Sequence, residues 1–315
     1  MFGRTRFLHC ITTRLEKNFY QHFSVFPFPS LKFHTGTMAL VLNGFSNDKI
    51  TTPLGSLPYK SNTQFLSLSE GSDNSEIIAQ CVRILHRGGV IAIPTDTLYG
   101  VACLAQCTEA VEKLYALKER NTVKPVAICV GETYDVSHWA RFPQGLLSSM
   151  SQKLGLHEEG RIYQRPSSPS ILEDFLNDLL PGPVTIVTQR SPALNSNLNP
   201  KTTSVGIRVP DCPFIRDLAS KLREPLALTS ANISGEEASL RIKDFRKLWP
   251  KLDAVVDGGV VGSNIVNNNL KYTMEGSTVF EIMPDGLTFK VLRAGCAYES
   301  TVRKLQENWN LKLVL

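Results

Sequence analysis

Polar side chains gather directly after several short apolar runs of this sequence. In the clearest case, Thr95, Asp96, Thr97 and Tyr99 place three hydroxyls and one carboxylate in a single loop. The loops beyond strand ends commonly hold ligands in α/β sheets. The same side chains also cap backbone amides in ordinary turns, so this loop alone assigns no chemistry.

Cations, hydroxyls and one amide recur at the ends of other apolar or helical runs. They are Lys118, Arg120, Arg208, Ser230, Asn232, Ser277, Thr278 and Arg293. The carboxyl end of a helix attracts cations through its dipole, so Lys118 and Arg120 also have a purely structural explanation. Arg208 lies within an apolar run and needs a partner anion, either an internal carboxylate or a ligand, because an unpaired buried charge is costly.

Common catalytic motifs are missing from the sequence. Neither the G-x-x-x-x-G-K-[ST] nor the G-x-G-x-x-G phosphate loop occurs, and there is no G-x-S-x-G turn. None of the six histidines lies in a strand-end motif, which argues against a Ser-His or Cys-His nucleophile. The seven cysteines include no C-x-x-C pair, and Cys103 and Cys107 lack a second cluster that would complete a zinc site. We therefore expect reduced thiols, no metal held by protein ligands, and chemistry that depends on positioning and on neutralising negative charge.

Helical and strand patterns alternate between these residues, which predicts an α/β fold. Helices are expected from Ser75 to the Gly88-Gly89 break and from Thr108 to Asn121. Strands are expected at 63–68, 90–93, 125–130, 184–188, 204–210, 225–232, 254–259, 277–282 and 287–292, the last two as a hairpin. The region 145–180 has little periodicity and is interpreted as a surface excursion or lid.

The chain has 315 residues and a globular composition, with 42% hydrophobic and 20% charged residues. We expect a transit peptide in 1–38, a flexible linker in 39–70, a folded domain in 71–298 and a short helix in 299–315. The first segment is rich in basic residues and nearly free of acids, which favours import into a mitochondrion or another organelle. Translation from Met38 would leave the protein in the cytoplasm. The net charge of +5 is weak evidence for nucleic-acid binding, because much of it lies in this segment.

Taken together, the strand-end motifs resemble those of the YrdC family of threonylcarbamoyl-adenylate synthases. The resemblance covers residues 75–298 and follows the family's order. Its motifs are Pro94–Gly100, Lys118-Glu119-Arg120, Leu180–Thr185, Gly206–Pro210, Thr229–Gly235, Asp257-Gly258-Gly259, Gly276-Ser277-Thr278 and Leu292-Arg293. Each motif alone is weak evidence for the family, but all of them in this order are specific to it.

The resemblance implies a YrdC-like, RibB-like twisted mixed sheet with flanking helices around a positively charged groove. It also implies that L-threonine, bicarbonate and ATP give threonylcarbamoyl-adenylate and pyrophosphate, with Mg²⁺ on the nucleotide. By motif match, Thr95, Arg208 and Ser277 would bind threonine. ATP would be bound by Lys118, Arg120, Thr185, Ser230, Asn232 and Arg293. Lys118, Arg120 and Arg208 would be the catalytic residues.

The family's product is the activated intermediate for threonylcarbamoylation of tRNA, so tRNA and a downstream threonylcarbamoyl transferase are the implied partners. Two departures are visible in this chain. The stretch 148–171 is longer than the compact family pattern, and Ala294 stands where the family often has proline. The chain also ends soon after Arg293, which is typical of the single-domain form.

Two other functions are consistent with parts of the sequence. A non-catalytic RNA-binding module could use the same basic groove, and its binding would depend on salt but not on threonine or ATP. A lyase of related fold acting on a sugar phosphate would need several acids around a divalent metal. Asp96 is the only acid of the central loop, which disfavours the lyase.

Overall fold

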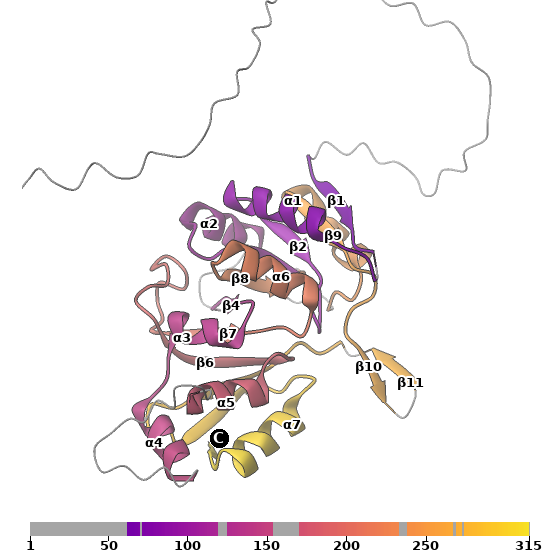
Figure 1. Ribbon diagram of the computed structural model, residues 1–315. Coiled ribbons are helices and arrows are strands. Elements are labelled where there is room, and N and C mark those ends of the chain that lie inside the picture. The colour runs from indigo at the N-terminus through magenta and orange to yellow at the C-terminus, as the bar shows by residue number, and fades with distance from the viewer. Residues whose placement is uncertain are drawn as a thin grey trace, which may run out of the picture. The chain divides into compact units, whose positions relative to one another are not determined.

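The computed structural model describes residues 62–69, 71–118, 125–153, 170–232, 238–266, 269–272 and 274–314 (Figure 1). The predicted transit peptide, most of the predicted linker, Arg120 and residues 154–169 of the long insertion lie outside these residues. No helix of the described part is long and apolar enough to cross a membrane.

A twelve-stranded mixed sheet organises the domain, in the order β1-β9-β2-β3-β8-β4-β7-β6-β12-β13-β14, with β5 paired to β6. The bounds in chain order are β1 Gln64–Ser67, β2 Ile91–Ile93, β3 Gly100–Leu104, β4 Ala127–Cys129, β5 Ala140–Arg141, β6 Val184–Arg190, β7 Ser204–Arg208, β8 Leu226–Ser230, β9 Ala254–Asp257, β12 Thr278–Ile282, β13 Thr288–Arg293 and β14 Lys312–Val314. A separate antiparallel hairpin joins β10 Ser263–Val266 to β11 Asn269–Tyr272. The fold class predicted from the sequence, a mixed α/β sheet with flanking helices, is confirmed.

Helices cover both faces of the sheet. They are α1 Ser75–His86, α2 Thr108–Leu117, η1 Thr133–Asp135, α3 Val136–Trp139, α4 Gln144–Lys153, α5 Ile171–Leu179, α6 Pro213–Leu222, η2 Ile242–Lys251, α7 Tyr298–Arg303 and η3 Lys304–Asn308. The helices α1 and α6 lie side by side over β2, β3, β8 and β9, where their apolar faces form one core cluster (Figure 1). The helices α2 and α5 and the C-terminal segment contribute to a second cluster, on the residues that alternate with the first along the strands.

The apolar periodicity explains why α1 forms where it does. Ile78, Cys81 and Leu85 recur at intervals of three and four residues and are all buried. The helix ends at His86, and Gly88 shortly after it adopts a positive φ of 72°, which residues with a side chain rarely accept. The next strand, β2, is buried along its whole length. The segment 75–93 therefore forms as the sequence predicts.

Several elements differ from the sequence-based expectations. The region 145–180 contains two helices, α4 and α5, and α5 begins with a capping box between Ser170 and Glu173. The predicted C-terminal helix is present as α7 and η3 over 298–308, but it does not extend over the whole of 299–315, because 312–314 form β14, which pairs in parallel with β13. The strand β3 was also missed, because its short run of small apolar residues has no period that separates a strand from a loop.

Candidate active site

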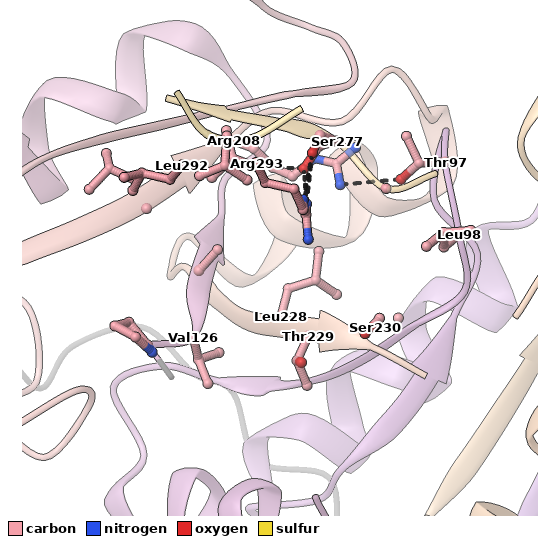
Figure 2. A pocket seen from close by; sticks show the side chains of 18 of the residues that line it. Thr97, Leu98, Val126, Arg208, Leu228, Thr229, Ser230, Ser277, Leu292 and Arg293 are labelled. Carbon is pink, nitrogen blue, oxygen red and sulfur yellow. Dashed lines mark hydrogen bonds between the residues drawn. The ribbon is translucent and has the colours of Figure 1, made fainter. Parts of the chain in front are cut away.

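A cavity of about 390 Å³ lies on the sheet, lined by side chains of its strands and of the loops beside them (Figure 2). Its floor is formed by alternate residues of neighbouring strands. One row across the floor consists of Leu228, Ala127, Gly206, Val187 and Glu281, from β8, β4, β7, β6 and β12. Alternate residues of a strand share one face, so every second residue of these strands faces the cavity. The site is therefore built mainly on strands, and loops contribute at its rim.

Small side chains leave room for the cavity. At Gly206, an added Cβ would lie 3.2 Å from Cγ2 of Thr185 and 3.5 Å from Cβ of Ala127. A larger side chain at this position would project into the space above the floor. Glycine in a strand interior often marks a close approach of this kind.

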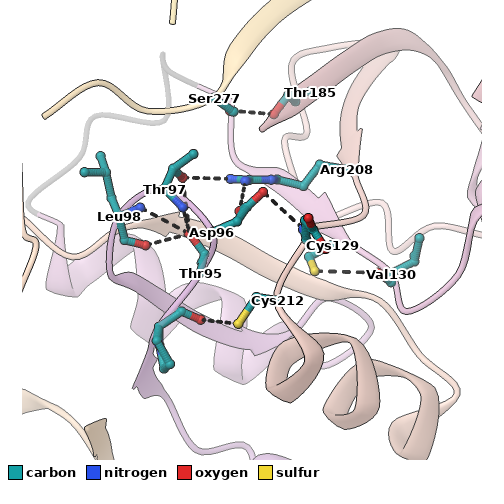
Figure 3. A network of polar contacts seen from close by, with 12 residues as sticks. Thr95, Asp96, Thr97, Leu98, Cys129, Val130, Thr185, Arg208, Cys212 and Ser277 are labelled. Carbon is teal, nitrogen blue, oxygen red and sulfur yellow. Dashed lines mark hydrogen bonds and ion pairs between the residues drawn. The ribbon is translucent and has the colours of Figure 1, made fainter. Parts of the chain in front are cut away.

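The polar loop that follows β2 is the connection of an antiparallel hairpin, since β2 pairs with β3. Hydrogen bonds of the Thr95 side chain fix the conformation of this loop. The Thr95 Oγ1 atom donates to the carbonyl of Leu98 at 2.7 Å and accepts from the amides of Thr97 at 3.1 Å and Leu98 at 3.2 Å (Figure 3). Thr95 lines the cavity, but its hydroxyl is engaged within the loop. Its predicted role in threonine binding stays a prediction.

Arg208 meets an internal carboxylate. Its Nη2 atom donates to Oδ1 of Asp96 in an ion pair whose side chains are only 7% and 9% exposed (Figure 3). The other carboxylate oxygen of Asp96 accepts from the amide of Asp211 at 3.1 Å. Cys129 stands beside Arg208 in the sheet, and burial raises its pKa to about 12, so the thiol stays neutral. Asp96 is therefore the counter-ion that positions the guanidinium.

The rest of the Arg208 guanidinium is only partly used. Its Nη1 atom makes a long contact of 3.5 Å with Oγ1 of Thr97, and its buried Nε atom has no hydrogen-bond partner among the described residues. Arg208 lines the cavity. A buried guanidinium with an unmet donor can hold a carboxylate or a phosphate oxygen of a ligand.

A second polar group joins the ends of β12 and β13. Oγ1 of Thr185 and Oγ of Ser277 are 2.9 Å apart. The Nε atom of Arg293 donates to the Ser277 carbonyl at 3.0 Å, and its Nη2 atom donates to the Ser277 Oγ at 2.9 Å. Partial burial, and then the nearby Arg208, lower the pKa of Arg293 below its usual value. Two guanidinium groups near each other indicate a site for an anion.

Lys118 caps the end of α2 and is almost completely buried, at 3% exposure. Its Nζ atom donates to the Ser230 carbonyl at 2.6 Å and to the carbonyl of Asn232. The Ser230 hydroxyl donates to Oδ1 of Asn232 at 2.6 Å. Lys118 thus joins Ser230 and Asn232, which lie more than a hundred residues later in the sequence, in one group at the end of β8.

The cavity brings together most of the predicted site residues. They are Thr95, Thr185, Arg208, Ser230, Ser277 and Arg293. Lys118 and Asn232 do not line it but contact Ser230 at its edge. Arg120 lies outside the described residues.

The sequence also offered signals for lining residues that received no role. Val279 and Glu281 alternate along β12, and both line the cavity. The period of two in the predicted strand 277–282 could have placed Glu281 on the site face. Tyr99 also lines the cavity, and its hydroxyl donates to the Gly259 carbonyl at 2.9 Å, which connects the rim loop to the end of β9.

Comparisons with known proteins agree on one family. The Sua5_yciO_yrdC family model, described as telomere recombination, matches residues 83–295. The human (Homo sapiens) protein named threonylcarbamoyl-AMP synthase is 41% identical over 239 residues, which cover 75% of this chain and 74% of that protein. A putative threonylcarbamoyl-AMP synthase of Methanocaldococcus jannaschii is 32% identical over 55% of this chain and 69% of that protein.

Solved structures show the same fold. The Sua5 protein of P. abyssi, determined in complex with L-threonine, aligns with a TM-score of 0.61 at 20% identity, over 80% of this chain and 63% of that chain. E. coli YciO aligns with a TM-score of 0.54 at 21% identity, over 74% of this chain and 96% of that chain. This chain thus spans less than two thirds of the P. abyssi protein. By the family match and the identity to the human protein, the chain belongs to the Sua5/YciO/YrdC family.

Proposed function

We propose that this protein is a threonylcarbamoyl-AMP synthase, which converts L-threonine, bicarbonate and ATP to threonylcarbamoyl-adenylate and pyrophosphate. The observation that carries the proposal is the cavity bordered by Arg208 and Arg293, with small polar side chains between them. The 41% identity to the human protein of that name supports it.

The reaction brings two anions together. The threonine amine and bicarbonate first give a carbamate and water, and a carbamate oxygen then forms a bond to the α-phosphorus of ATP. The bond between that phosphorus and the bridging oxygen breaks, and pyrophosphate leaves with the electron pair. Repulsion between carbamate and phosphate opposes this step, so fixed cations at the site lower its barrier.

We assign the cations by their places in or beside the cavity. Arg208, fixed by Asp96, offers its guanidinium group to the carboxylate or carbamate of the amino acid, beside the hydroxyls of Thr185 and Ser277. Arg293 reaches the α-phosphate, and Lys118 beside Ser230 takes the charge of the departing pyrophosphate. Arg120, which lies outside the described residues, keeps its predicted role in binding ATP.

Mg²⁺ accompanies the nucleotide in this proposal. The described residues include no group of three or more His, Cys, Asp or Glu side chains placed to hold a metal ion. The hydroxyls, amides and cations that line the site suit phosphate oxygens better than a bare cation. The ion therefore enters on the phosphates of ATP, where it offsets their charge.

The proposed product is consumed by transfer to tRNA, so a threonylcarbamoyl transferase and tRNA are the proposed partners. Import into an organelle through residues 1–38, with a cytoplasmic form from Met38, is part of the same proposal. Fractionation of cells, followed by sequencing of the amino terminus in each fraction, tests it. A single cytosolic species that keeps Met1 would contradict import.

The first experiment measures pyrophosphate release by the full chain with ATP and bicarbonate, with and without L-threonine. We expect release that depends on threonine, and a loss of about a hundredfold in Arg208→Ala because a fixed charge is removed. Salt-dependent tRNA binding by a folded protein that releases no pyrophosphate would instead favour the RNA-binding alternative.

A further inference from the structure

Glu281 is a carboxylate without a partner among the described residues, in a cavity otherwise suited to anions. It is partly buried on β12 and is the only acidic residue among the described side chains that line the cavity. Lys290 stands opposite it in the sheet register, yet no ion pair or hydrogen bond joins Glu281 to any described residue. A carboxylate in such a place repels phosphates, so it needs a ligand group of another kind.

The position of Glu281 separates it from Lys118 but not from Arg293. The strand that carries Ser230, beside Lys118, is four steps away in the sheet order β8-β4-β7-β6-β12. At about 4.8 Å per step, this is about 19 Å. Arg293 and Thr185 are the register partners of Val279, which lies two residues, or about 7 Å along β12, from Glu281. Glu281 therefore lies close to Arg293, which we assign to the α-phosphate, and far from Lys118, which we assign to the pyrophosphate.

The neighbours of Glu281 suit the apolar and polar parts of a nucleoside. Val187 is its direct partner in β6, and Val279 and Leu292 line the same end of the cavity. Leu292 is 50% exposed, so apolar surface there is open to a ligand (Figure 2). Adenosine has an apolar ring face, and its hydrogen-bond donors are the ribose hydroxyls and the 6-amino group. A carboxylate accepts from either kind of donor.

We propose that Glu281 accepts a hydrogen bond from the nucleoside part of ATP and thereby selects the nucleotide. The inference rests on the proposed synthase function and extends it. The hydrogen bond to Glu281 orients the nucleotide. Its phosphates lie toward Arg293 and Lys118, and its nucleoside lies over Val187 and Leu292. A threonine ammonium and a phosphate-bound Mg²⁺ are the cationic alternatives for a carboxylate, and the KM for threonine and the Mg²⁺ requirement of a Glu281 variant distinguish them from the nucleoside.

The test compares the full chain with Glu281→Gln, which keeps the side-chain size and removes the charge. Glu299→Gln, which changes an exposed carboxylate of α7 that does not line the cavity, is the matched control. Threonine-dependent pyrophosphate release gives kcat/KM for ATP, for 2′-deoxy-ATP, which lacks one ribose donor, and for inosine triphosphate, which lacks the amino donor.

We expect Glu281→Gln to lower kcat/KM for ATP about tenfold, because hydrogen bonds to a charged acceptor are the strong ones. The preference of the wild-type protein for ATP over one analogue should shrink by a similar factor. A smaller preference against 2′-deoxy-ATP identifies the ribose as the donor, and a smaller preference against inosine triphosphate identifies the base. The KM for threonine and the Mg²⁺ requirement of Glu281→Gln should equal those of the wild type. Glu299→Gln should keep the wild-type kcat/KM for all three nucleotides.

If Glu281→Gln keeps the wild-type preference for ATP over both analogues, the inference is overturned, while the proposed synthase function still holds. A rise in the KM for threonine, or in the Mg²⁺ requirement, would also overturn it, by assigning Glu281 to one of those ligands. Failure of the proposed function looks different, since wild-type protein would then release no pyrophosphate with any nucleotide. Calorimetric titration with ATP and the two analogues tests the contact in that case.

Discussion

At the scale of single residues, the buried pair of Arg208 and Asp96 makes a testable contribution to stability. Removing one member of a buried ion pair leaves the other charge without compensation. We expect Asp96→Ala to lower the free energy of unfolding by about 3 kcal/mol. Urea unfolding followed by circular dichroism measures this change. Asp217→Ala, at an exposed carboxylate of α6, is the control. An unchanged midpoint for Asp96→Ala would mean that Arg208 does not depend on Asp96.

Lys118 makes a different prediction, because its ammonium group lies against carbonyl oxygens at the end of β8. Lys118→Ala removes a positive charge that we assign to the leaving pyrophosphate. We expect kcat to fall about a hundredfold, since fixed electrostatic groups contribute on that scale. Steady-state kinetics test this, and the circular dichroism spectrum of the variant must match that of the wild type. Normal kcat in a folded variant would limit Lys118 to holding the loop after β8.

At the scale of secondary-structure elements, the strands that form the cavity floor require small residues where they approach each other. Gly206→Val would place its branched side chain between Thr185 and Ala127, whose nearest atoms already lie 3.2 and 3.5 Å from an added Cβ. We expect the fold to persist and the KM values for ATP and threonine to rise tenfold or more, because the floor is filled. Thermal unfolding and kinetics together measure this. Gly206→Ala adds only the Cβ, which meets Thr185 at 3.2 Å and Ala127 at 3.5 Å, so its smaller effect separates the loss of the glycine from the filling of the floor.

Elements with strong local patterns were predictable, while those fixed by tertiary contacts were not. The helix from Ser75 and the hairpin of β12 and β13 follow from periodicity and turn residues. β14 exists because it pairs with β13, and three residues of sequence carry no such information. In the site, residue types indicated an anion-binding cavity, but the partner of Arg208 was decided by long-range geometry. A separation of 112 residues between Asp96 and Arg208 leaves no local signal for their contact.

At the scale of the whole molecule, the site is assembled from distant parts of one sheet. Thr95 and Arg293 border the same cavity, although nearly two hundred residues separate them in the sequence. The strand that carries Arg293 is in turn paired with the C-terminal strand β14. Nearby, Trp309 donates to Asp178 of α5 at 2.8 Å. A ligand that binds across this cavity therefore contacts several elements that must all be folded together.

We accordingly expect ATP and threonine to stabilise the entire domain rather than one loop. A ligand at one hundred times its Kd stabilises the folded state by about 2.7 kcal/mol, which raises the Tm of a domain of this size by roughly 5–10 °C. Differential scanning fluorimetry with each ligand and with both measures the shift, and Arg208→Ala should reduce the shift caused by threonine. A melting profile in which only one of two separate transitions moves would contradict a site that depends on the whole sheet.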